Sequence, residues 1–238
     1  MTLPEYHPVP LTGPEGHLDA AWHAPPGGAA PRFAAVVAHP HPLYGGSKDN
    51  VVVLEVARAL VRAGGGALRF DFRGVGRSAG SHGGGSAELD DLLAAARLAR
   101  ELVAGVPLLV AGYSFGAIVA LRWLGPDDRC AEHARPAAVL ALAPPILHYD
   151  LGFLEKNAVP LGVLCGAEDA LTRRDELARQ TAAWGGVAAT AWIEGAGHDL
   201  GANGQPHLLR TALDDSFGLL LQRAGAGGTA SAPPRSRT

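Results

Sequence analysis

The amino-acid sequence predicts an α/β domain with a mostly parallel central sheet of about eight strands, flanked by helices on both faces. Short apolar runs alternate with segments of helical periodicity along most of the 238 residues. Hydrophobic residues make up 47% and charged residues 18%, which is typical of a folded globular chain. We expect one domain over residues 1–223 and a disordered, low-complexity tail over residues 224–238.

The first predicted elements form a β-hairpin. Residues 7–11 and 17–22 are expected to be its strands, with a turn at Gly13 and Pro14 between them. The next predicted strand, residues 33–38, is apolar throughout. A strand that is covered on both faces has this pattern, so we place it in the middle of the sheet.

The rest of the chain alternates strands with helices. The remaining strands are predicted at 67–72, 106–112, 137–143, 161–165 and 188–193. The helices are predicted at 51–62, 87–103, 115–124, 173–184 and 206–222. Ser86 is the expected N-cap of the second helix. Since parallel sheets of this kind bind ligands beyond the carboxyl ends of their strands, the residues after each strand are the candidates for function.

Composition argues against several classes of partner. The net charge is −3 and no cluster of Lys or Arg is present, so nothing favours nucleic acid or an anionic membrane. No uncharged apolar stretch reaches the ~20 residues of a membrane span, and the first residues lack the pattern of a signal peptide. We therefore expect a cytoplasmic protein, and the sequence does not indicate its oligomeric state.

The two cysteines do not define a disulfide framework. Cys165 ends an apolar run and is predicted to be a buried strand residue, whereas Cys130 is predicted to lie in a polar loop. The pattern does not require a disulfide between them.

A Gly-x-Ser-x-Gly pattern occurs twice, around Ser114 and around Ser78. A nucleophilic serine in this pattern needs a sharp turn from a strand into a helix, which exposes the hydroxyl and aims the next backbone N–H at the developing oxyanion. Ser114 lies between a predicted strand and a predicted helix. Ser78 is followed by a glycine-rich segment, residues 81–85, that is unlike a helix. We therefore predict Ser114 as the nucleophile.

The segment around Ser78 also mimics a dinucleotide-binding fingerprint. Residues 74–79 fit Gly-x-Gly-x-x-Ala after a strand, but a helix should open directly from such a motif, and glycines intervene here. We therefore expect no nicotinamide or flavin cofactor.

His198 is the candidate base for Ser114. It follows the predicted strand 188–193 through a short loop with two glycines, which can carry the imidazole back over the edge of the sheet. An acid and a base that serve such a serine follow it in the chain, in that order. Other histidines also follow Ser114, but none comes so directly after a strand; they are His133, His148 and His207.

Two carboxylates, Glu168 and Asp169, follow the predicted strand 161–165. We favour Asp169 as the residue that orients His198, because it lies farther from the strand and its short side chain would hold the ring more rigidly. Glu168 stays the alternative. Asp199 is disfavoured because adjacent residues cannot easily form the required bond to Nδ1.

The loop at residues 39–46, His-Pro-His-Pro-Leu-Tyr-Gly-Gly, is expected to complete an oxyanion hole. Its prolines have no N–H, which leaves His39, His41 and Leu43 as donors. We favour the backbone N–H of His41, with that of Phe115 as the other donor. His39 and His41 also permit a metal-binding pair, but the sequence offers no convincing set of further ligands, so we expect no metal.

Five segments together resemble a known family. They are residues 39–46, 70–78, 112–116, 166–169 and 195–198. In this order they are similar to a family of small, capless bacterial α/β-hydrolases related to dienelactone hydrolase, and the resemblance covers residues 5–222. It implies the α/β-hydrolase fold, a Ser-His-Asp mechanism, no cofactor, and a role for Arg73 and Ser78 in organising a loop. Dienelactone hydrolase has cysteine in place of Ser114, so its substrate is not implied.

The resemblance also bears on the substrate. Cap domains in this fold are commonly inserted where this chain has only residues 144–160, so we expect an open site. Its expected lining is Tyr44, Tyr113, Phe115, His148 and Leu200. An open site suits small or accessible carboxylic esters, cleaved through an acyl-enzyme. The alternatives are a thioester, peptide or peracid reaction at the same triad, or a non-catalytic binding protein on the same fold.

Overall fold

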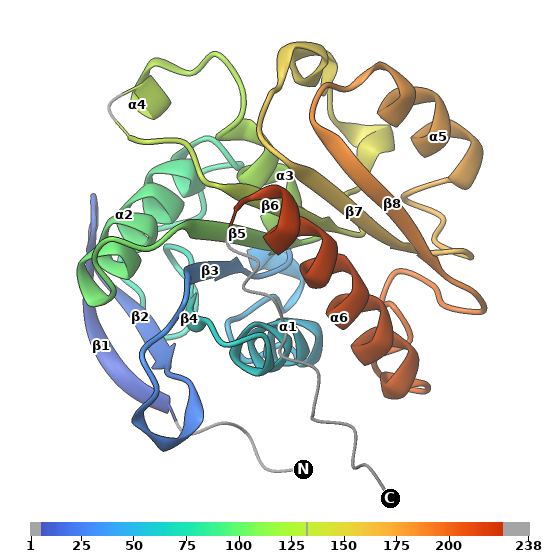
Figure 1. Ribbon diagram of the computed structural model, residues 1–238. Helices are drawn as coiled ribbons and strands as arrows, with labels where there is room; N and C mark the ends of the chain where they lie inside the picture. The colour runs from blue at the N-terminus through green and yellow to red at the C-terminus, as the bar shows by residue number, and fades with distance from the viewer. Residues whose placement is uncertain (1–5, 132, 226–238) are drawn as a thin grey trace, which may run out of the picture.

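The computed structural model describes residues 6–131 and 133–225, so the predicted tail lies outside the described residues from position 226 onward. The described residues form one eight-stranded sheet with the order β1-β2-β4-β3-β5-β6-β7-β8 (Figure 1). The strands are β1 Tyr6–Gly13, β2 Gly16–His23, β3 Ala34–Ala38, β4 Gly66–Phe70, β5 Leu108–Tyr113, β6 Ala138–Leu142, β7 Leu161–Gly166 and β8 Val187–Ile193. Strand β2 is antiparallel to both of its neighbours, β1 and β4, and every other pair of adjacent strands is parallel. The predicted mostly parallel sheet is confirmed.

Helices cover both faces of the sheet. They are α1 Val51–Arg62, α2 Ala87–Leu102, α3 Phe115–Arg122, α4 Asp128–Ala131, α5 Arg174–Ala183 and α6 Pro206–Arg223. Helices α1 and α6 pack on one face, and α2 and α3 pack on the other (Figure 1). Four short 3₁₀ helices complete the described elements: η1 Pro26–Gly28, η2 Pro42–Tyr44, η3 Ile146–His148 and η4 Gly152–Lys156. Only η3 and η4 lie between β6 and β7, so no large cap is inserted there.

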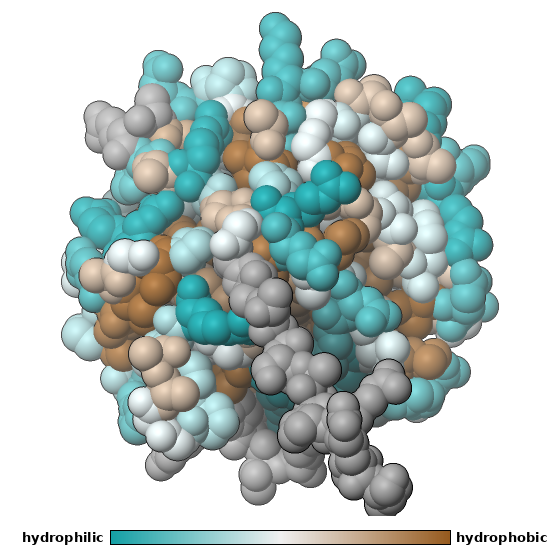
Figure 2. Space-filling view, viewed as in Figure 1, coloured by the Kyte–Doolittle hydropathy of each residue, from teal (hydrophilic) through white to brown (hydrophobic). Residues whose placement is uncertain are grey.

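The apolar run of β3 divides its side chains between two cores. Val36 packs with the α2–α3 side of the sheet, and Val37 packs with the α1–α6 side. Both side chains are fully buried, and each such burial contributes roughly 1.5–3 kcal/mol. The outer side of α6 is polar by contrast, with Asp214, Asp215 and Gln222 exposed. Figure 2 shows hydrophilic residues over much of this face, with apolar residues in small patches between them.

Three local predictions were wrong. The hairpin turn falls one residue later than predicted, at Pro14 and Glu15. Cys130 does not lie in a polar loop but is buried in α4, a helix too short for periodicity to reveal, and both cysteines are free. Ser86 makes no side-chain cap, because its own backbone is already helical.

Glu88, in the first turn of α2, holds the loop that precedes the helix. Its carboxylate accepts hydrogen bonds from the N–H groups of Gly83 and Gly85, at 2.7 and 2.6 Å. These bonds hold the carboxylate in its charged form, so the pKa of Glu88 lies below its ordinary value although burial opposes this.

No helix among the described residues is long and apolar enough to cross a membrane.

Strand β5 and helix α3 approach each other very closely. A Cβ on Gly112 would lie 2.2 Å from the carbonyl oxygen of Gly116, and a Cβ on Gly116 would lie 2.5 Å from the carbonyl oxygen of Ala38. Backbone atoms cannot yield as a flexible side chain can. Both glycines are therefore required by the packing of the α3 N-terminus against β5 and the end of β3.

We predict that Gly116→Ala lowers the free energy of unfolding by about 1–3 kcal/mol, the usual cost of overpacking. Gly218→Ala is the matched control, because Gly218 lies inside α6 and a Cβ there would have no described atom within 4 Å beyond its own helix backbone. That change should stabilise the protein by roughly 0.5–1 kcal/mol. Urea denaturation of the two variants measures both values, and equal stability of the two would contradict the packing argument.

Candidate active site

Ser114 lies on the turn between β5 and α3, in a backbone conformation that non-glycine residues rarely adopt. Its φ is 55° and its ψ is −116°. The Ser114 N–H donates to the carbonyl oxygen of Leu142 at 2.8 Å, which ties the turn to the neighbouring strand β6. In the described part of the chain, the other non-glycine residues with positive φ are Ala143 and Leu200. Ala143 follows β6 and Leu200 lies just after His198, so backbone strain is concentrated around this site.

The side chains of Ser114, His198 and Asp169 meet beyond the carboxyl ends of the parallel strands. His198 Nε2 lies 2.8 Å from Ser114 Oγ, and His198 Nδ1 lies 2.8 Å from Asp169 Oδ2. A carboxylate only accepts, so Nδ1–H donates to Asp169 and Nε2 of the neutral ring accepts the Ser114 hydroxyl. The structure thus brings the three predicted residues into one hydrogen-bonded series.

Asp169, and not its neighbour Glu168, reaches the imidazole. The Asp169 side chain is fully buried, and its second oxygen accepts the N–H of Leu171 at 2.8 Å. Glu168 is exposed and has no side-chain hydrogen bond among the described residues. Asp199 is occupied elsewhere, because it accepts hydrogen bonds from Gly201 and Asn203 in its own loop.

Three of the five expected substrate-lining residues, Tyr113, Phe115 and Leu200, are buried, so the expectation that their side chains line an open site was wrong. Tyr113 donates its hydroxyl to the carbonyl oxygen of His198 at 3.0 Å, and burial raises its pKa, so the phenol stays protonated and able to donate. Leu200 is fully buried in the α1–α6 core. Tyr113 and Leu200 therefore support the His198 loop from below. Tyr44 and His148, in contrast, are exposed.

The two backbone N–H groups predicted as oxyanion donors belong to Phe115, at the start of α3, and to His41. Neither Phe115 nor His41 donates its backbone N–H to any acceptor within residues 6–131 and 133–225. The His41 ring lies 4.8 Å from the Phe115 ring between centroids, so the loop at 39–46 lies against the start of α3.

His39 holds the start of this loop as a neutral side chain. The Phe72 N–H donates to its Nε2 at 3.0 Å, so its proton is on Nδ1, which donates to the Pro40 carbonyl oxygen at 2.6 Å. Burial lowers the pKa of His39 to about 4. Both ring nitrogens are thus engaged, and the described residues contain no group of three or more His, Cys, Asp or Glu placed to hold a metal ion.

The loop after β4 is organised by Arg73 and Ser78, as the resemblance implied. Arg73 binds the buried carboxylate of Asp91 at 2.7 and 2.9 Å. Ser78 Oγ donates to the Asp71 carbonyl oxygen at 2.8 Å and accepts the Asp19 N–H at 2.9 Å. The Ser78 hydroxyl therefore bonds to two backbone groups, whereas the Ser114 hydroxyl contacts a histidine side chain.

His82 lies near the site and was not singled out from the sequence. Its ring centroid is 4.9 Å from that of His41 and 5.5 Å from that of Phe115, and its Nδ1 lies 2.7 Å from Glu88 Oε1. The sequence showed only a glycine-rich break at 81–85. The sequence offered one signal for a role of His82 near the site: a histidine within that break, six residues before Glu88 at the start of a helix.

Comparisons with known proteins agree with this architecture. The model of the family described as serine aminopeptidase, S33, matches residues 43–156 of this chain. A lidless α/β serine hydrolase from Xanthomonas campestris is 31% identical, covers 97% of each chain and superposes with a TM-score of 0.73. An α/β serine hydrolase homologue from Coxiella burnetii is 27% identical, with a TM-score of 0.77 over 90% of this chain and 98% of its own.

A further relative is an uncharacterised protein from Rickettsia prowazekii. It is 34% identical over 171 residues, which are 70% of this chain and 68% of the relative. The chain belongs to the α/β serine hydrolases, a class that the parallel sheet and the serine turn define.

We predict that His39 makes the stability of the fold depend on pH. Its pKa is about 4 when folded and 6.5 in its ordinary state, so the unfolded chain binds more protons between these values. Neutral His39 therefore contributes on the order of 3 kcal/mol to the free energy of unfolding. This contribution is fully present above pH 6.5 and is lost as the pH falls toward 4. Urea denaturation over this window should show a shallower loss of stability in His39→Gln, whose amide can still accept the Phe72 N–H. Equal slopes would contradict the prediction.

Proposed function

We propose that this chain hydrolyses small or accessible carboxylic esters, with Ser114 as nucleophile, His198 as general base and Asp169 as the residue that orients it. The observation that carries the proposal is the continuous series of 2.8 Å contacts from Ser114 Oγ through His198 to Asp169. A serine hydroxyl is a weak nucleophile until a base removes its proton, and the base needs a partner that fixes its tautomer. This arrangement meets both needs.

The reaction proceeds through an acyl-enzyme. Ser114 Oγ attacks the ester carbonyl while His198 Nε2 takes its proton, and Asp169 stabilises the resulting imidazolium. The N–H groups of Phe115 and His41 bind the oxyanion. The alcohol then leaves with the proton from His198. A water molecule, deprotonated by His198, attacks the acyl-enzyme and releases the acid and the Ser114 hydroxyl.

The surroundings of Ser114 favour accessible substrates. The segment between β6 and β7 holds only η3 and η4, so no domain is inserted there that could enclose the site. Leu43 and Tyr44 are 69% and 87% exposed on the loop that carries His41. Exposed apolar side chains at this place suit contact with the apolar part of an ester.

The first test is covalent labelling with a fluorophosphonate followed by an ester panel. The wild-type protein should be labelled and should hydrolyse p-nitrophenyl acetate, whereas Ser114→Ala should do neither. The panel should include a thioester and an aminoacyl anilide, the latter because one matching family is described as serine aminopeptidase. Equal labelling of both proteins would refute Ser114 as the nucleophile, and faster turnover of the anilide would overturn the ester assignment.

The second test separates the neighbouring carboxylates. Asp169→Asn should lower kcat by about 10³–10⁴, because the amide favours the wrong tautomer of His198. Glu168→Gln is the matched control and should leave kcat within about twofold, since Glu168 is exposed and does not contact His198. Steady-state kinetics on the best ester measures both. A large loss in Glu168→Gln with little in Asp169→Asn would reverse the assignment.

A further inference from the structure

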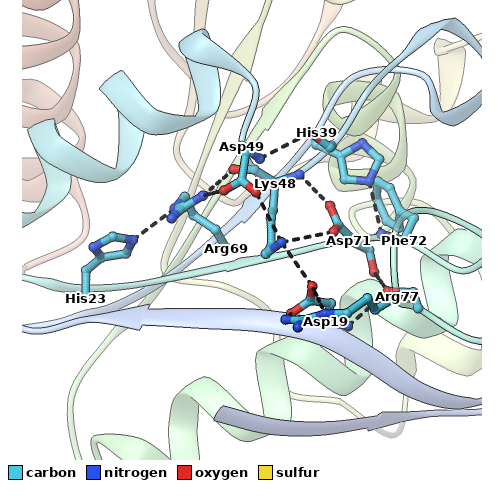
Figure 3. Close-up of polar contacts among 11 residues, drawn as sticks. Asp19, His23, His39, Lys48, Asp49, Arg69, Asp71, Phe72 and Arg77 are labelled. Carbon is cyan, nitrogen blue, oxygen red and sulfur yellow. Dashed lines mark hydrogen bonds and ion pairs between the residues drawn. The ribbon is translucent and has the colours of Figure 1, made fainter. Parts of the chain in front are cut away.

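A cluster of charged side chains lies around Lys48, where the chain passes from the loop that carries His41 to helix α1. It consists of Asp19 on β2, Arg69 on β4, Asp71 just beyond β4, Lys48 and Asp49 before α1, and Arg77 in the loop after β4. Figure 3 shows the Lys48 side chain extending between the carboxylates. We call this group the Lys48 cluster. Its three carboxylates are matched by three cations; Asp49 and Arg77 are exposed, whereas Asp19, Lys48, Arg69 and Asp71 are largely shielded from water.

Lys48 is held by both its main chain and its side chain. Its backbone N–H donates to Asp71 Oδ1 at 2.6 Å, and its ammonium group donates to Asp71 Oδ2 at 3.2 Å. The same ammonium group lies 3.1 Å from Asp19 Oδ2. The exposed fractions of the Lys48 and Asp71 side chains are only 14% and 3%. Charge-assisted bonds that are shielded from water in this way fix a position far better than surface pairs do.

Arg69 adds a second attachment at the same point. Its guanidinium donates to the carbonyl oxygen of Lys48 and, at 2.8 Å, to Asp49 Oδ1. Its Nε donates to His23 Nε2 at 2.9 Å, as Figure 3 also shows. The Arg69 side chain is 2% exposed, so it forms a rigid base on β4 for the end of the loop.

The start of the loop is attached to the same segment of chain. His39 accepts the N–H of Phe72, the residue after Asp71. Between the two attachments the loop closes on itself. The carbonyl oxygen of His41 accepts from Gly46 at 3.1 Å, and a Cβ on Gly46 would lie 2.0 Å from the Pro40 carbonyl oxygen. The position of the His41 N–H therefore depends on two neighbouring residues, Asp71 and Phe72.

We propose that Lys48 and Asp71 are positioning residues for the oxyanion hole. They hold the loop at 39–50 so that the N–H of His41 stays directed at the oxyanion formed at Ser114. This inference rests on the proposed function, because it assigns the ion pair an effect on the transition state of that reaction. Neither side chain is required to touch the substrate.

The test is Lys48→Met, which removes the ammonium group and keeps a stem of similar length. We expect kcat to fall about tenfold or more, with KM changed by less than about threefold, because the lost interaction acts in the transition state. The inhibition constant of a boronic acid, whose tetrahedral adduct occupies the oxyanion hole, should rise by a similar factor. Lys48→Arg should recover much of kcat.

The matched control is Lys156→Met, which makes the same chemical change at the other lysine of the chain. Lys156 is exposed in η4, so kcat should stay within about twofold of the wild type. Circular dichroism checks that each variant is folded. If Lys48→Met does not fold, Asp71→Asn takes its place, because it keeps an acceptor for the Lys48 N–H but removes the negative charge.

The outcomes separate this inference from the proposed function. A folded Lys48→Met or Asp71→Asn with wild-type kcat and boronic acid affinity would overturn the positioning role alone. A rise in KM without loss of kcat would also overturn it. A wild-type protein that hydrolyses none of the esters would overturn the proposed function and this inference with it.

Discussion

The site depends on one constraint, the close approach of β5, α3 and the end of β3 around Ser114. Glycines at 112 and 116 allow backbone atoms to meet where a Cβ would lie 2.2–2.5 Å from a carbonyl oxygen. Ser114 lies at this contact in a strained backbone conformation, and the N–H of Phe115, at the start of the helix, has no acceptor among the described residues. The contact also sets the loop that carries His41 against the same helix. The proposed nucleophile Ser114 and the N–H of Phe115 are thus placed by this contact, whereas the loop that carries His41 is also held by Asp71 and Phe72.

The other components reach this point from strands farther along the sheet. Asp169 follows β7 and His198 follows β8, and both strands run parallel to β5. Because parallel strands end at the same edge, residues 84 positions apart come within 2.8 Å. Tyr113 links the serine turn to the His198 loop, since it precedes Ser114 in the chain and donates to the His198 carbonyl oxygen. We assign the corresponding part for the loop that carries His41 to the Lys48 cluster.

Most of the fold and the core of the site could be predicted from local patterns. The apolar run of β3 gave its central position, and the strand-turn-helix context distinguished Ser114 from Ser78. What escaped prediction depends on tertiary contacts. Glu88 binds the N–H groups of two glycines in the loop before α2, and Leu200 is a core residue because its loop folds inward. The role of Lys48 was also hidden, because its partners are spread from Asp19 to Asp71 and no short motif records them.

The most direct measurement of the central claim is a crystal structure of the protein inactivated by a small phosphonate. The account predicts phosphorus bonded to Ser114 Oγ, with the phosphonyl oxygen within hydrogen-bond distance of the N–H groups of Phe115 and His41, and with His198 between the adduct and Asp169. A phosphonate bound to another residue, or a phosphonyl oxygen directed away from both N–H groups, would contradict it.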